Sequence, residues 1–214
     1  MEPRARNRIE TVIGIALIGV SLLIVGYLTW QTGSSLQKAG EPKTVKITVA
    51  PPTPSTLEMW DAYERAQKAA WQEALDAQLV SATAQWQAAT EKEMLAGADN
   101  WVFTFYSPTE RQLIVVHVNV GSARVVHRTQ MQAMPAQLAE GRWHEGPNDA
   151  LLIFLANGGR EFMETHLQAV IDLHLGNYEG RGPAWDILAS DAESRESVLV
   201  VIDTETMRVL THRP

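Results

Sequence analysis

The stretch WVFTFYSPTERQLIVVHVNVGSARVVHRT, residues 101–129, alternates aromatic or aliphatic side chains with a second, more polar set. A period of two residues places alternate side chains on opposite faces of an extended strand. Residues 107–110 and the dipeptide Gly121-Ser122 interrupt the alternation with residue types that favour turns, and glycine tolerates the positive φ of a type II′ turn. We therefore predict three antiparallel strands joined by two hairpin turns.

The residues before this stretch predict a helix followed by a further strand. Apolar residues recur at spacings of three and four from Trp60 to Ala74, which is typical of one helix face. Ser55 and Glu58 fit a capping box at the start of this helix. The period then changes to two over residues 80–86, which favours a strand. Continuation of the helix to Ala89 is the alternative, because alanine and glutamine are good helix formers.

Residues 148–213 repeat this order of elements. Asn148 is a suitable N-cap for a second helix, within which Gly158-Gly159 predicts a kink or a close approach to another backbone. Strands are expected after this helix at residues 168–175, 183–190, 197–202 and 208–212. Each half of the sequence therefore predicts one helix followed by three or four strands.

The end of the second half, VLVVIDTETMRVL at residues 198–210, has a strand–turn–strand pattern that resembles the PepSY domain, also found in propeptides of thermolysin-like peptidases. Met207 stands where that family usually has glycine. Residues 116–126 carry a shorter version of the pattern, with Asn119 near the aspartate position. The resemblance implies an α+β unit in which one helix packs on a small antiparallel sheet. It also implies a role in restraining peptidases, or in regulatory binding outside the cytoplasm.

One segment is apolar enough to cross a bilayer. Residues 11–30, TVIGIALIGVSLLIVGYLTW, carry no charge, and about 20 helical residues span the ~30 Å hydrocarbon layer. Arg4, Arg6 and Arg8 precede the segment, and positive charges favour the cytoplasmic side. We therefore expect a single-pass cell-membrane protein with a cytoplasmic N-terminus and an extracytoplasmic C-terminal domain. A cleaved signal peptide is the alternative, which the length of the apolar run disfavours.

These patterns together predict an α+β protein with one transmembrane helix and two tandem helix-on-antiparallel-sheet, PepSY-like repeats. In the linker, the alternating residues 45–49 are either a spacer or a short strand added to a sheet edge. The predicted divisions are a cytoplasmic N-terminus (1–10), a transmembrane helix (11–30), a linker (31–54), a first repeat (55–130), a connector (131–147) and a second repeat (148–214).

Composition and motifs argue against several classes of function. The formal net charge of −7 disfavours binding of nucleic acid through bulk electrostatics. The absence of cysteine excludes disulfides and thiolate metal sites. The six histidines lack the spacing of known metal-binding motifs, and no serine lies in a GxSxG motif. We therefore expect no catalytic residue, metal ion or cofactor, and no enzymatic activity.

The predicted function is that of a membrane-anchored, extracytoplasmic binding or regulatory protein. Its predicted partners are the lipid bilayer, through residues 11–30, and another extracytoplasmic protein such as a peptidase. A sheet with an exposed edge can accept a partner strand through backbone hydrogen bonds. Trp143 and Trp185 are the candidate partner-binding residues, because aromatic side chains anchor interfaces, although Trp143 is also suited to packing between the two halves. The alternative function is an accessory or assembly subunit of a membrane protein complex.

Overall fold

The structure is a computed structural model that describes residues 56–138, 143 and 146–213. The chain divides into two compact units, Met1–Pro52 and Thr53–Pro214. The first unit lies outside the described residues, as do the predicted transmembrane helix at residues 11–30 and the predicted linker at 31–54. The account below concerns the second unit.

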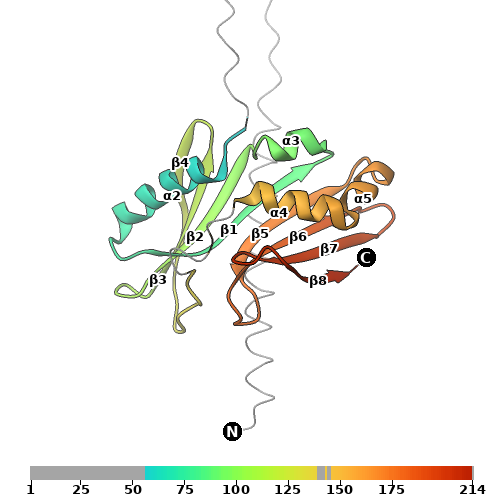
Figure 1. Cartoon of the computed structure of the whole chain (residues 1–214). Coiled ribbons are helices and arrows are strands. Elements are labelled where there is room, and N and C mark those ends of the chain that lie inside the picture. Colours follow the sequence, from blue (N-terminus) through green and yellow to red (C-terminus); the bar gives the residue numbers. More distant parts are fainter. Residues whose placement is uncertain (1–55, 139–142, 144–145, 214) are drawn as a thin grey trace, which may run out of the picture. The chain divides into compact units, whose positions relative to one another are not determined.

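The second unit is built on one antiparallel sheet of eight strands, in the order β4-β3-β2-β1-β5-β6-β7-β8 (Figure 1). The first strand of each half lies at the centre, where β1 pairs with β5. Both halves therefore belong to a single sheet. The strands are β1 (Gln78–Gln87), β2 (Asn100–Ser107), β3 (Gln112–Asn119), β4 (Ser122–Gln130), β5 (Val170–Asn177), β6 (Pro183–Ser190), β7 (Ser197–Asp203) and β8 (Val209–Arg213).

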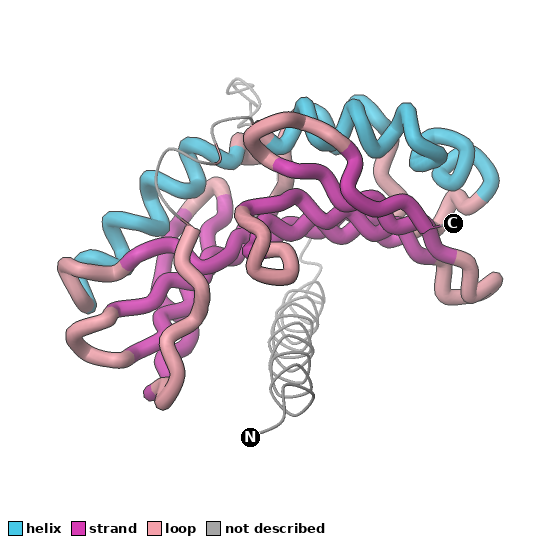
Figure 2. Tube along the Cα trace, turned by 60° about the horizontal axis from the view of Figure 1, so that its bottom comes forward, coloured by secondary structure: helices cyan, strands magenta, loops and turns pink. Residues whose placement is uncertain are grey.

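The described helices cover one face of the sheet (Figure 2). A long helix precedes β1, a single short helix lies between β1 and β2, and a kinked helix of three parts precedes β5. These elements are α2 (Met59–Glu73), α3 (Glu91–Leu95), and the continuous run of α4 (Pro147–Phe154), η1 (Leu155–Gly159) and α5 (Arg160–Thr165).

The predicted fold class is wrong. Each half has a helix followed by four strands, in the predicted order, but the strands form one eight-stranded sheet and not two separate small sheets. The protein is also richer in β-structure than two helix-on-sheet repeats behind a transmembrane helix would be. The difference arises because a period of two fixes which face of a strand is buried, but not which strand becomes its neighbour.

The predicted localisation is withdrawn with the fold class. None of the helices in residues 56–138 and 146–213 is long and apolar enough to cross a bilayer. The single-pass topology, with a cytoplasmic N-terminus and an extracytoplasmic C-terminal domain, therefore receives no support from the described part of the chain.

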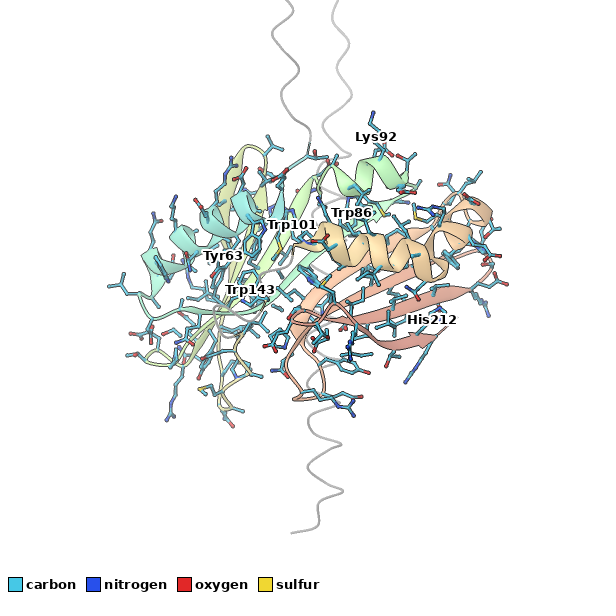
Figure 3. The ribbon with its side chains drawn as sticks, viewed as in Figure 1. Tyr63, Trp86, Lys92, Trp101, Trp143 and His212 are labelled. Atoms are coloured by element: carbon cyan, nitrogen blue, oxygen red, sulfur yellow. The ribbon has the colours of Figure 1, made fainter. Side chains whose placement is uncertain are left out.

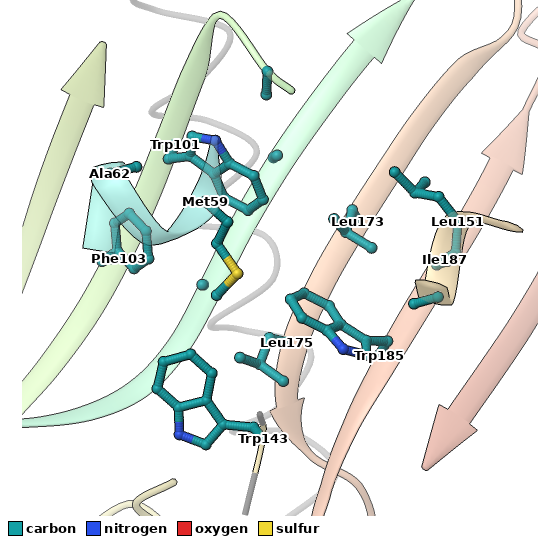
Figure 4. Close-up of a cluster of buried hydrophobic side chains, with 14 of the residues drawn as sticks. Met59, Ala62, Trp101, Phe103, Trp143, Leu151, Leu173, Leu175, Trp185 and Ile187 are labelled. Carbon is teal, nitrogen blue, oxygen red and sulfur yellow. The ribbon is translucent and has the colours of Figure 1, made fainter. Parts of the chain in front are cut away.

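A stripe of small side chains holds α2 close to the sheet. Ala62, Ala66 and Ala70 are fully buried at spacings of four residues. Ala62 lies near the buried Trp101 and Phe103 of β2 (Figure 4), and all three alanines belong to the same buried cluster as these aromatic side chains. Alanine lets the helix axis approach the sheet, so the aromatic rings fill the space between the layers.

The start of α2 differs from the prediction. Its N-cap is Glu58, which makes no side-chain capping bond, and Ser55 lies outside the described residues. A complete capping box occurs instead at α3, where the Thr90 hydroxyl accepts from the Glu93 N–H and the Glu93 carboxylate accepts from the Thr90 N–H. The sequence Thr-x-x-Glu at residues 90–93 is the signature of this motif.

The predicted kink at Gly158-Gly159 is confirmed. Asn157 and Gly158 leave helical geometry, and Gly158 has a φ of 95°, which side chains other than glycine rarely adopt. A Cβ at Gly158 would lie 3.7 Å from the His212 Nε2 on β8. The kink therefore lets the helical layer pass close to the last strand of the sheet.

The β3–β4 hairpin turns one residue earlier than predicted. Asn119 pairs with Ser122, so the turn residues are Val120 and Gly121. The Asn119 Oδ1 accepts from the N–H groups of Gly121 at 3.0 Å and Ser122 at 2.8 Å. The asparagine side chain thus stabilises the turn, and Gly121 does not need a positive φ.

We expect Ala66→Leu to destabilise the protein by about 1–3 kcal/mol, because the added carbons have no space between α2 and β2. Urea unfolding followed by tryptophan fluorescence measures this change. Lys68→Leu on the exposed side of the same helix is the matched control, and we expect a change within about 0.5 kcal/mol. Equal effects of the two substitutions would contradict the close packing of the alanine stripe.

Candidate functional site

The described residues offer no group of three or more histidine, aspartate or glutamate side chains that could hold a metal ion. Several acidic and serine side chains make contacts that stabilise the fold. Glu91 pairs with Arg160, Glu93 caps α3, and the Ser107 hydroxyl donates to the Asp76 carboxylate. The Asp203 carboxylate accepts from the N–H groups that follow it in the β7–β8 turn.

The two predicted partner-binding tryptophans lie in the interior. Trp185 on β6 is fully buried in the core between helices and sheet, and Trp143 is only 5 % exposed (Figure 4). The Trp143 indole stacks on Trp60 with ring centroids 5.1 Å apart and meets the Tyr63 ring edge-on at 5.1 Å. Neither tryptophan is accessible to a partner in this conformation, so a candidate site has to lie elsewhere.

The two outermost strands leave backbone groups available for pairing. β4 pairs with β3, and β8 pairs with β7, each along one side. Within the described ranges, no strand pairs with the other side of either. Unpaired backbone N–H and C=O groups along a strand form a template for an added strand. These two edges are therefore the candidate functional sites.

Both edges contain a β-bulge at the equivalent position. In β4, Val116 pairs with Val125 and Val115 pairs with His127, so Val126 is the extra residue. In β8, Ile202 pairs with Val209 and Val201 pairs with Thr211, so Leu210 is the extra residue. A bulge bends a strand and increases its twist, which restricts the strands that can pair with it.

The edges are also basic in an acidic protein. The segments are RVVHR at residues 124–128 and RVLTHR at residues 208–213, and neither contains an acidic residue, although the chain has a net charge of −7. Charges on edge strands oppose nonspecific association of sheets. Such charges also favour a partner segment of opposite charge.

The β8 edge leaves more of its side chains available than the β4 edge. Arg128 on β4 forms an ion pair with Glu73 of α2. Arg208, His212 and Arg213 are exposed and form no ion pair with any described residue. Figure 3 labels His212 among the side chains of the C-terminal strands. The aliphatic side chains Val209 and Leu210 are also exposed, at 38 % and 40 %.

The sheet face opposite the helices has a polar centre where the two halves meet. On this face, Gln85 of β1 donates from Nε2 to the Asp172 Oδ1 of β5 at 2.7 Å. His174 lies two residues after Asp172 on β5, and its Nδ1 is 3.4 Å from the Asp186 Oδ2 of β6. Burial raises the pKa of Asp172, and the Gln85 hydrogen bond only partly opposes this effect. These contacts join β1, β5 and β6.

His117 lies on the same face, farther toward β4. It is 5 % exposed, and its Nε2 lies 3.1 Å from the Asn100 Oδ1. Burial lowers the pKa of His117, and the neighbouring Arg124 lowers it further, so the imidazole is neutral at physiological pH. The predicted turn at Gly121-Ser122 would place His117 opposite Val126, but the structure pairs it with Arg124 because the turn lies one residue earlier.

The sequence predicted binding at an exposed sheet edge but did not indicate which strands form that edge. The signal that was available is the similarity between RVVHR and RVLTHR at the ends of the two halves. Each segment reads as an ordinary short strand when it is considered alone. Their shared role becomes visible only once the strand order places both at the outside of one sheet.

The chain matches no model of a known protein family and no characterised protein. The PepSY resemblance of residues 198–210 therefore stays a prediction. Among solved structures, the chain is similar to a candidate lipoprotein from Clostridium difficile 630, with 12 % sequence identity and a TM-score of 0.47. The similarity covers 74 % of this chain and 98 % of the other.

We expect Asp172→Asn to change the pH dependence of stability. In the folded protein the Asp172 pKa is raised, so between the unfolded value near 3.9 and the folded value the native state holds a proton that the unfolded state releases. The free energy of unfolding of the parent therefore falls as pH rises through this window. The variant has no such proton to release, so its free energy of unfolding should not fall in this way. From pH 4 to pH 7 the variant should therefore gain stability relative to the parent, as measured by urea unfolding.

Asp76→Asn is the control, because here the expected change of stability with pH has the opposite sign. Hydrogen bonds from Ser107 and Thr109 lower the pKa of Asp76 to about 2. Its ionised form therefore stabilises the fold above the unfolded value near 3.9, and this stabilisation is lost as pH falls toward 2. Asp76→Asn should weaken the protein at pH 7 and differ less from the parent at pH 2. The same pH trend for both variants would contradict the two assignments.

Proposed function

We propose that this chain is a protein-binding module that accepts an extended segment of another protein as an additional strand of its sheet. The observation that carries the proposal is the unpaired outer side of β4 and β8 within the described residues. Strand addition uses backbone hydrogen bonds for affinity and side chains on alternating faces for specificity.

The rest of the fold is suited to presenting such an edge. Large buried side chains between the helices and the sheet hold the strands in place, including Trp101, Phe103 and Trp185. A receiving strand that is already ordered does not lose conformational freedom when the partner binds. A partner segment would therefore pair with a preformed template.

A regulatory role agrees with this mode of binding. A segment held as an added strand is fixed in an extended conformation, and its backbone groups are no longer available to other proteins. The PepSY-like pattern at residues 198–210 covers most of β7, the turn and the first two residues of β8. The proposed partner is therefore an extended segment of a regulated protein, such as a peptidase.

Selection from a random peptide library on the full-length chain tests the proposal. We expect selected peptides to slow hydrogen exchange of backbone amides in β4 or β8, because those amides become hydrogen-bonded to the added strand. Hydrogen exchange read by mass spectrometry or NMR measures this protection. Protection confined to the helices or to the central strands would show that binding occurs by another mode.

A backbone-modified peptide is the matched control. Methylation of alternate peptide nitrogens removes the N–H donors on one side of the added strand and leaves the side chains unchanged. We expect such a peptide to bind at least about tenfold more weakly than its unmodified form, a difference of about 1.4 kcal/mol. Equal affinity of the two peptides would rule out strand addition.

A further inference from the structure

We propose that β8 is the edge that receives the partner, and that the partner segment alternates acidic with apolar residues. This inference rests on the proposed function and adds to it the location of the site and the chemistry of the ligand. It is argued from the register of β8, from the exposure of its side chains and from its charges.

The register assigns the side chains of β8 to two faces. Val209 and His212 pair with Ile202 and Val200, which belong to the core beneath the helices. Thr211 and Arg213 pair with Val201 and Leu199 and so lie on the opposite face. The proximity of the His212 Nε2 to Gly158 in the helical layer agrees with this assignment.

An added strand would meet a different environment on each face. On the helix side, its side chains would lie beside exposed Val209 and His212, of which Val209 favours an apolar residue. On the other side, they would lie beside Arg213, which favours a carboxylate. Because side chains alternate between the faces, the complementary segment alternates acidic and apolar residues. Arg208, at the start of the strand, adds attraction for the same segment.

The equivalent edge at β4 fits such a segment less well. Glu73 already pairs with Arg128 there, and an acidic partner would have to displace that carboxylate or lie beside it. Val125 and Val126 are also less exposed than Val209 and Leu210. The β4 edge therefore offers less unpaired positive charge and less apolar surface.

The same charges disfavour two other occupants. A second copy pairing through β8 would bring the cationic side chains of two edges together, and like charges on adjacent strands are destabilising. The alternating residues 45–49 of this chain, VKITV, contain Lys46 and no acidic residue. An acidic segment from another protein is therefore the occupant that the edge favours.

Two soluble ten-residue peptides test the inference, one alternating glutamate with valine and the other alternating lysine with valine. Fluorescence anisotropy with the full-length chain measures binding at low salt and at physiological salt. At low salt, we expect the glutamate peptide to bind at least about tenfold more tightly than the lysine peptide. Its advantage should fall as salt rises, because the cations of the edge are exposed and screened.

Paired variants locate the binding edge. Arg208→Glu with Arg213→Glu reverses two charges at β8, and Arg124→Glu with Arg128→Glu reverses two charges at β4 as the matched control. We expect the β8 variant to lose at least about tenfold in affinity for the glutamate peptide, and the β4 variant to change by less than about threefold. Circular dichroism and thermal unfolding confirm that both variants are folded.

The outcomes separate the inference from the proposed function. If the β4 variant loses affinity and the β8 variant does not, or if the lysine peptide binds more tightly, the inference is overturned while strand addition stands. If an alternately N-methylated glutamate peptide binds as well as the unmodified one, strand addition itself fails. Loss of self-association in the β8 variant, measured by light scattering, would identify a second copy as the occupant and would also overturn the inference.

Discussion

The pairing of β1 with β5 is the contact on which the rest of the structure depends. It runs antiparallel from Ala82 opposite Leu175 to Gln87 opposite Val170, and it turns two similar halves into one sheet. Each half contributes its first strand, β1 or β5, to the central pair, and its last strand, β4 or β8, forms an outer edge of the sheet. The candidate binding edges are therefore a consequence of the central pairing as much as of their own sequences.

The two faces of the sheet are specified by different residue types. Alanine on α2 and aromatic residues on β2 produce close packing of the first half's helix on its strands. The opposite face carries polar contacts at the centre, where Gln85 and Asp172 join the two halves. The apolar layer supplies most of the stabilisation through burial, whereas the polar contact links stability to pH through Asp172.

Local patterns in the sequence predicted much of the secondary structure but not its assembly. The strand at Pro183–Ser190 has its predicted bounds, and the alternation at residues 80–86 correctly favoured β1 over a longer helix. Pairing between halves was not predictable, because alternation does not name a neighbouring strand. Binding at an exposed sheet edge was predicted, but for the same reason the sequence did not show that β4 and β8 are the outermost strands. Trp143 and Trp185 were chosen for their residue type, but in the structure both side chains are buried.

The equivalent bulges at Val126 and Leu210 show that the two halves are alike even in their outermost strands. A lone half would be a four-stranded unit with open strands on both sides, β1 and β4 or β5 and β8. Such a unit is self-complementary, since two copies joined through their first strands would reproduce the strand order of the present sheet. Fusion of two copies into one polypeptide then frees each end to change its sequence independently, which symmetric assembly of identical subunits does not allow.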